Sequence, residues 1–444
     1  MFRRSEIPAA RVHDTLRQHM LVDGYPIVVD LEYSKESWLC DLVTGKQYLD
    51  FFSFFGSNPI GFNHPSMLDG DVKARIARAG VHRISNSDYY TAYMAEFVDT
   101  LSRSAAPPDL PHYFFIDGGT LAVENGMKVA FDWKVRKNLA AGKGEKGAQI
   151  LHLRHAFHGR SGYTLSVTNT DPVKTDYFPK FAWPRISSPA IVFPLHEHLD
   201  AVIAAEKQSI AEAERAFAEN PDDIAAILVE PIQAEGGDHH FRGEYLRELR
   251  RLADEREALL IFDEIQTGLG LTGKWWAYQH FDVEPDILCF AKKMQVGGIF
   301  CSRRVDEVKD NVFSVPSRIN STFGASLVDM VRCTHILEVI QNEGLLDNAA
   351  ARGAELLLGL EEVQARFDAV VTNARGRGLM CAIDLPTPDL RNKVVRRCFE
   401  DGMIVLKCGP RSIRFRPTLT VSADAIQEGV RRLGQAIGEV VGRG

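Results

Sequence analysis

A carboxylate and an amine each follow an apolar segment of the kind that forms a buried strand. Asp263 ends the run Ala258–Phe262, and Lys292 follows the next run, Ile287–Phe290, after one alanine. Parallel strands bring such ends to one edge of a sheet, where ligands of α/β proteins bind. A lysine can form a Schiff base with an aldehyde, and a carboxylate can hold a pyridine nitrogen protonated. The pair therefore fits pyridoxal 5'-phosphate (PLP) chemistry, although an aspartate at a strand end is common in α/β folds and most lysines lie at the surface.

Two lysines compete for the covalent role, because Lys293 directly follows Lys292. Side chains alternate across a strand, so the two should point in opposite directions if the extended backbone continues. The spacing alone does not choose between them.

A glycine turn follows another apolar run, Tyr113–Ile116, just before a helical stretch. Glycines let the backbone approach an anion closely, and the free N–H groups of a helix N-terminus favour negative charge. We therefore expect Gly118, Gly119 and Thr120 to bind a phosphate, although such turns are also common where no phosphate binds.

Aromatic and basic residues follow the run Gln149–Leu153, in the segment that contains Phe157, His158 and Arg160. An aromatic ring at this edge of the sheet could stack on a planar cofactor, and an arginine could bind a carboxylate. The alternative is a core phenylalanine with a surface arginine.

Two glutamates follow the run Ala225–Val229. Glu230 and Glu235 could pair with arginine beside a ligand, and we place both at the substrate. A solvated loop is the alternative interpretation of this segment.

Between residues 110 and 325 short apolar runs alternate with longer amphipathic stretches, which is typical of a mostly parallel sheet covered by helices. The expected strands are Tyr113–Ile116, Gln149–Leu153, Ala225–Val229, Ala258–Phe262, Ile287–Phe290 and Ile299–Cys301. The expected helices include Ala122–Lys137, Leu199–Glu219 and Gly243–Arg256. The pattern predicts an α/β fold whose large domain is a sheet sandwiched by helices.

Both ends of the chain carry shorter elements. We expect strands at Tyr25–Glu32, Trp38–Asp41 and Gln47–Phe52, and a long helical stretch from 326 to about Phe367. Strand-like segments then follow at Gly376–Leu385, Ile404–Leu406 and Ile413–Phe415. These elements predict a small α+β domain built from residues 1–60 and 326–444, around a large domain of residues 61–325.

Composition narrows the class of protein. The 444 residues are 45% hydrophobic and 25% charged, as in soluble globular proteins. The net charge of −7 and the scattered basic residues argue against nucleic-acid binding, and no run approaches the ~18 apolar residues of a membrane span. The seven cysteines are odd in number and far apart, which predicts reduced, buried thiols, a cytoplasmic location and no metal site. The first 20 residues predict a short helix rather than a transit peptide.

In their order and spacing these segments resemble the class III (ornithine/GABA-type) aminotransferases, a PLP-dependent family of fold type I. The resemblance extends over nearly the whole chain, including Tyr48–Phe51, Gly61–Pro65, Asn320–Gly324, Arg375–Met380 and Ile413–Pro417. Within the family the chain is most similar to the lysine ε-aminotransferase subgroup, through Phe51–Gly61, Asp117–Asn125, Ala156–Leu165, Gln266–Gly273 and Lys292–Gly298. Leu121 replaces the acidic residue that usually follows the glycine turn in the wider family.

The resemblance implies a role for each cofactor residue. Lys292, the first lysine, takes the Schiff-base position, and Gly119–Thr120 form the phosphate turn. Phe157, beside His158, stacks on the ring, and Gln266 faces the phenolic oxygen. Thr322 reaches the phosphate of the neighbouring subunit, which implies a homodimer with shared active sites.

The implied reaction transfers the ε-amino group of L-lysine to 2-oxoglutarate, giving 2-aminoadipate 6-semialdehyde and L-glutamate. Glu235 would neutralise Arg414 while lysine reacts and would swing away when 2-oxoglutarate brings its α-carboxylate. Arg160 would hold the distal carboxylate, and Phe55 and Gly56 would border the substrate.

Three alternatives remain open at this point. The donor could be another ω-amine, such as ornithine, 4-aminobutyrate or acetylornithine. The chain could be an aminomutase or racemase of the same fold, which would not consume 2-oxoglutarate. A PLP-binding protein without enzymatic activity is the third alternative.

Overall fold

The computed structural model describes residues 7–442, and its largest sheet has seven strands. Their order is β3 (His112–Ile116), β11 (Gly297–Cys301), β10 (Ile287–Phe290), β9 (Leu259–Asp263), β6 (Ile224–Val229), β4 (Gln149–Leu153) and β5 (Arg185–Ile186). Strand β11 is antiparallel to both of its neighbours, and the other adjacent pairs are parallel. The central strands are buried on both faces, which explains their uninterrupted apolar sequences.

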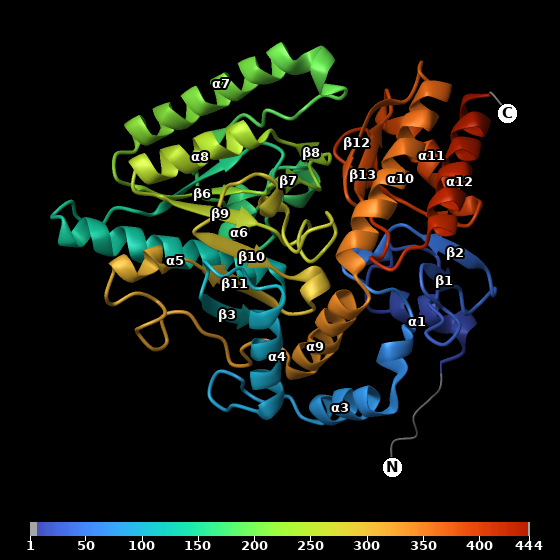
Figure 1. The fold of residues 1–444 in the computed structure, drawn as a ribbon, viewed down its shortest axis with the longest axis horizontal. Helices are drawn as coiled ribbons and strands as arrows, with labels where there is room; N and C mark the ends of the chain where they lie inside the picture. The colour runs from blue at the N-terminus through green and yellow to red at the C-terminus, as the bar shows by residue number, and fades with distance from the viewer. Residues whose placement is uncertain (1–6, 443–444) are drawn as a thin grey trace.

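Helices cover both faces of this sheet. Helix α5 (Gly119–Ala140) packs along one face, against β11, β10 and β6, while α7 (Leu195–Glu219) and α8 (Gly243–Glu255) cover the other, as Figure 1 shows. Further helices of this part of the chain are α3 (Gly70–Val81), α4 (Ala92–Arg103) and α6 (Gly162–Val167). The predicted α/β sandwich is confirmed.

The two ends of the chain fold together beside the large sheet (Figure 1). Strands β1 (Trp38–Cys40) and β2 (Gln47–Asp50) join β14 (Met403–Ile404), which pairs in parallel with β2. A second sheet has the order β12 (Thr372–Arg377), β13 (Met380–Asp384), β16 (Ser412–Phe415) and β15 (Leu406–Cys408). The helices around them are α10 (Leu345–Arg366), α11 (Pro388–Glu400) and α12 (Ala423–Val441). The β2–β14 pairing supports a second unit from both chain ends, whose exact boundaries stay a prediction.

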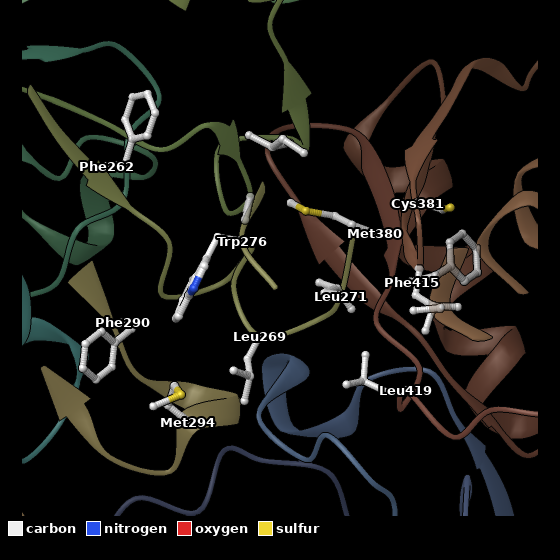
Figure 2. Close-up of a cluster of buried hydrophobic side chains, with 14 of the residues drawn as sticks. Phe262, Leu269, Leu271, Trp276, Phe290, Met294, Met380, Cys381, Phe415 and Leu419 are labelled. Atoms are coloured by element: carbon white, nitrogen blue, oxygen red, sulfur yellow. The ribbon is translucent and has the colours of Figure 1, made fainter. Parts of the chain in front are cut away.

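A buried apolar cluster joins the C-terminal sheet to the large sheet (Figure 2). Leu271 and Trp276, in the loop after β9, lie between Phe290 of β10 and Met380 of β13. Met294 belongs to the same cluster and is fully buried. Burying one such side chain stabilises a fold by about 1.5–3 kcal/mol. The turn that carries the two adjacent lysines is therefore held in place by the packing of Met294 in the core.

Some local predictions differ from the structure. Tyr25–Glu32 forms no strand, only a single bridge between Val29 and Asp41. The Asp30 carboxylate there accepts hydrogen bonds from the N–H groups of Glu32 and Tyr33, which turns the chain out of an extended path.

The long helix predicted up to Phe367 is two helices, α9 (Leu327–Asn342) and α10. Gly344 interrupts them with a φ of 62°, a left-handed conformation that favours glycine. Helix α9 packs against α3 and α4 rather than with α12, so the break redirects the chain from one part of the molecule to the other.

The predicted strand Gly376–Leu385 is instead a hairpin, because β12 and β13 pair in antiparallel fashion across the turn Gly378–Leu379. The N-terminal helix is α1, Val12–Arg17. The seven cysteines are free and buried, and no helix within residues 7–442 is long and apolar enough to cross a membrane.

Candidate active site

A pocket of about 760 Å³ opens where the strands β4, β6, β9 and β10 end. Its wall includes Asp263, Lys292, Phe157 and the turn Gly118–Thr120, together with residues of the segment 54–63 and of α9. The tertiary structure thus brings the segments singled out in the sequence to one site.

The structure decides between the two lysines. Lys292 lines the pocket, whereas Lys293 is buried and its Nζ donates to the main-chain oxygen of Gln266 at 3.0 Å. The backbone leaves the strand at Lys292, whose φ of 48° is strained for a residue with a side chain. Burial and then the nearby Arg414 lower the pKa of Lys292 to about 8, against the opposing effect of Asp263 and two glutamates. Lys292 is therefore the amine that faces the site.

Asp263 is held in a fixed orientation at the end of β9. Its Oδ2 lies 2.8 Å from Nδ1 of His158, and its Oδ1 accepts from the N–H of Ile265 at 3.0 Å. Both side chains are buried. His158, predicted to bind the cofactor, therefore acts through the carboxylate by orienting it, and it also lines the pocket.

The turn predicted to bind a phosphate is the N-terminus of α5. Gly118 precedes the helix with a φ of 85°, and no side chain caps the helix. The first N–H groups and the positive end of the helix dipole are thus left for an anion. The backbone of strand β11 packs closely against this turn. A Cβ atom added to Gly297 would lie only 2.6 Å from the main-chain oxygen of Gly118.

Glu230 lines the pocket but is occupied by main-chain donors. It accepts from the N–H of Phe157 at 3.0 Å and from that of Ala234 at 3.1 Å. Burial raises its pKa to about 7. We placed Glu230 at the substrate from the sequence; in the structure it fixes the loop that carries Phe157.

Gln266 presents its amide nitrogen to the pocket. Its Oε1 accepts from Nη1 of Arg414 at 2.9 Å and from Nε of Arg416 at 3.3 Å. A guanidinium can only donate, so the amide oxygen must face the arginines and the NH₂ group is left for the pocket. Arg416 is itself held by the fully buried Asp238. Such a donor suits an anionic oxygen like the phenolate of PLP.

Arg414 and Glu235 form an ion pair, as the resemblance implied. Arg414 is fully buried, and its Nη2 donates to Oε2 of Glu235. The other oxygen, Oε1, accepts from Nζ of Lys174. Burial opposes ionisation of Glu235, but the two cations together lower its pKa below the ordinary value.

Six of the predicted residues do not line the pocket: Glu235 and Arg414, whose ion pair contacts the pocket-lining Gln266, and Arg160, Phe55, Gly56 and Thr322. Arg160 is exposed, with its guanidinium 5.9 Å from the ring centroid of Phe157. Phe55 is exposed and Gly56 is buried behind the site near Lys293; Phe54 lines the pocket in their place. Thr322 is exposed on this chain.

Sequence reasoning missed Lys174, the Arg416–Asp238 pair and Gln295. Gln295 lines the pocket and donates to the main-chain oxygens of Ser57 and Lys292. Lys174 lies in a polar loop with no sequence signal of its own. Gln295 follows the two lysines in a segment that is typical of the subgroup, but its hydrogen bonds depend on tertiary contacts.

The donor set fits PLP. A lysine, a fixed carboxylate, an uncapped helix N-terminus, an aromatic ring and an amide donor surround one pocket. No cluster of His, Cys, Asp or Glu within residues 7–442 could hold a metal ion.

Fold and site together define a PLP-dependent transferase of fold type I. The family model for class-III aminotransferases matches residues 20–437, and the chain belongs to this family, whose cofactor is PLP.

Two relatives that share about half of their residues with this chain are named for one substrate. The L-lysine-epsilon aminotransferase of Mycobacterium tuberculosis is 52% identical over 429 residues, which are 96% of this chain and 95% of the relative. The Streptomyces clavuligerus enzyme of the same name is 49% identical, covering 97% and 94%. The solved structure of the M. tuberculosis lysine aminotransferase in its internal aldimine form has a TM-score of 0.96 at 51% identity, covering 98% of this chain and 100% of that one.

Proposed function

We propose that this chain transfers the ε-amino group of L-lysine to 2-oxoglutarate, giving 2-aminoadipate 6-semialdehyde and L-glutamate. The observation that carries the proposal is the pairing of Glu235 with Arg414 beside Lys292, in a chain about half identical to L-lysine-epsilon aminotransferases. The lysine substrate offers a bare methylene amine to the reacting centre, and a neutralised arginine suits it. The keto acid brings an α-carboxylate, which requires the arginine to be free.

Lys292 is the proton carrier of the reaction. When bound, PLP supplies an electron sink that acidifies the substrate carbon bearing the amine. The Nζ of Lys292 takes a proton from that ε-carbon. Its pKa of about 8 keeps a useful fraction of the amine neutral at physiological pH. Asp263, fixed by His158, holds the pyridine nitrogen protonated.

Glu235 acts as a gate over Arg414. Closed, the glutamate pairs with the arginine and the pocket accepts the uncharged methylene chain of lysine. Open, Arg414 binds the α-carboxylate of 2-oxoglutarate through two parallel hydrogen bonds. Arg414 stays in place in both states, because Gln266 holds its Nη1.

Arg160 binds the carboxylate at the far end of either substrate. It is exposed and forms no ion pair within residues 7–442, so its charge is available. Its guanidinium lies 5.9 Å from the ring centroid of Phe157, a residue that lines the pocket.

The active enzyme is a homodimer in the cytoplasm. Thr322 is exposed on this chain, as a residue that reaches a neighbour's phosphate must be. Seven free, buried thiols suit a reducing compartment.

Product identification tests the proposal. Purified holoenzyme is incubated with L-lysine and 2-oxoglutarate, and products are identified by mass spectrometry. We expect glutamate and the 6-semialdehyde (as its cyclic imine) in equal amounts, and none without the keto acid. A strong preference for ornithine or 4-aminobutyrate as donor would reject the substrate assignment, and turnover without 2-oxoglutarate would reject transamination.

A further inference from the structure

Glu235 has two cationic partners, one on each carboxylate oxygen. Arg414 donates to Oε2, and Nζ of Lys174 lies 2.5 Å from Oε1. The side chains of Glu235 and Lys174 are 22% and 16% exposed, while that of Arg414 is wholly buried. The carboxylate thus lies between a buried cation that also contacts the pocket-lining Gln266 and a second cation that is partly exposed.

Lys174 has a fixed backbone and a position beside the pocket. It ends the short 3-10 helix Pro172–Lys174, which Asp171 caps by accepting from the N–H of Val173 at 3.1 Å. Its Nζ lies 5.5 Å from the ring centroid of Phe157, which lines the pocket. The flexible side chain can follow the carboxylate while the loop stays in place.

When the ion pair between Glu235 and Arg414 opens, each of the two residues needs another partner for its charge. Arg414 keeps the hydrogen bond to Oε1 of Gln266 and gains the carboxylate of the arriving keto acid. Glu235 would be left as a largely buried, unpaired anion if Arg414 were its only partner, which is strongly unfavourable. Lys174 is the partner that remains.

We propose that Lys174 is a positioning residue that keeps Glu235 paired when it leaves Arg414, and so determines how readily the enzyme accepts 2-oxoglutarate after lysine. The inference rests on the proposed function, because it concerns the same gate. Lys174 stabilises the state in which Glu235 has left Arg414, because the glutamate then still has a cationic partner. It does not contact the reacting atoms.

The holoenzyme variants Lys174→Met and Lys174→Arg test the inference, with Lys180→Met as the matched control. Lys180 lies in the same loop and, in the described part of the chain, donates to the main-chain oxygen of Thr175 and forms no ion pair, so its replacement removes one charge and leaves both cationic partners of Glu235 in place. Each half-reaction is followed separately by the cofactor absorbance in single turnovers. We expect Lys174→Met to lower the efficiency of the 2-oxoglutarate half-reaction about tenfold. The lysine half-reaction should change less than about twofold, and Lys174→Arg should restore the wild-type ratio.

Calorimetric binding of glutarate, an unreactive dicarboxylate, gives a readout independent of turnover. Lys174→Met should weaken glutarate binding about tenfold, whereas Lys180→Met should not. In a Glu235→Ala background Arg414 is always open, so adding Lys174→Met should leave glutarate affinity unchanged.

Two outcomes would overturn the inference. Equal effects of Lys174→Met on both half-reactions would make Lys174 a structural ion-pair partner only. Equal weakening of glutarate binding with and without Glu235 would mean that Lys174 simply attracts the dianion. A wild-type enzyme that does not react with lysine would instead refute the proposed function, and the glutarate measurements would still test Lys174.

Discussion

Lys293→Met and Lys292→Ala separate the roles of the two adjacent lysines. Lys293 is buried, and in the described part of the chain its Nζ is the one donor to the main-chain oxygen of Gln266. Methionine keeps a similar apolar stem but leaves that oxygen without a donor, which costs about 1–3 kcal/mol. Burial and the nearby Lys292 hold the pKa of Lys293 well below its ordinary value, so little is lost by removing its charge. We expect a net destabilisation of about 1–2 kcal/mol.

The expected change in thermal midpoint is small. The unfolding entropy of about 2.1 cal/mol/K per residue amounts to about 0.9 kcal/mol/K for 444 residues. A loss of 1–2 kcal/mol therefore lowers the midpoint by about 1–2 °C, which differential scanning calorimetry resolves. The thermal midpoint of Lys292→Ala should also lie within about 1–2 °C of the wild-type value. This variant should, however, lose the covalent link to the cofactor.

Borohydride reduction of the holoenzyme fixes the cofactor to its lysine, and peptide mass spectrometry locates the tag. Wild type and Lys293→Met should carry the tag on Lys292. Lys292→Ala should carry none, although Lys293 is still present. A tag on Lys293 in the Lys292→Ala variant, or its loss in Lys293→Met, would refute the reasoning from side-chain direction and burial.

Three further changes test the site and its support. Arg414→Met should move the pH midpoint of the lysine half-reaction above the value near 8, because Arg414, after burial, lowers the pKa of Lys292; single turnovers across pH check this, and an unchanged midpoint contradicts it. Asp50 is wholly buried and its pKa is raised from 3.8 to about 6, so its contribution to stability is present below pH 3.8 and is lost as the pH rises through 6. Asp50→Asn should avoid that loss of about 3 kcal/mol. Urea unfolding should therefore show the free energy of unfolding of the variant rising relative to that of the wild type from about pH 4 to 7. A difference between the two proteins that does not change with pH would contradict this prediction. Gly297→Ala should weaken PLP binding about tenfold or more, because its Cβ would lie 2.6 Å from the oxygen of Gly118; equilibrium dialysis measures this, with Gly24→Ala, which meets nothing within 4 Å, as the control that should bind normally.

Much of the fold was predictable because burial on both faces leaves a direct mark on sequence. Strands such as β6 and β10 are apolar throughout, and their limits match the predicted ones within about one residue. Short or half-exposed elements leave weaker marks. The extended segment Tyr25–Glu32 forms no strand, because the side chain of Asp30 offers its main chain other hydrogen bonds.

The site was predictable where a residue type must follow a particular strand. Asp263, Lys292 and Gly118–Thr120 fall at strand ends or at a helix N-terminus, and all line the pocket. Phe55 and Gly56, expected beside the substrate, do not line the pocket of this chain. Their segment turns with positive φ values at Phe54 and Phe55, a left-handed path that no periodicity predicts, and it presents Phe54 instead.

The sequence by itself determined the local chemistry of this protein: an amine and a carboxylate after buried strands, and glycines before a helix. It determined these because backbone geometry and strand burial act on residues close together in the chain. Only the tertiary structure decided which lysine faces the pocket, that Gln266 is oriented by two arginines, and that Lys174 shares Glu235 with Arg414. These contacts join residues far apart in sequence, and in a partly buried site the direction and pairing of a charge depend on such neighbours.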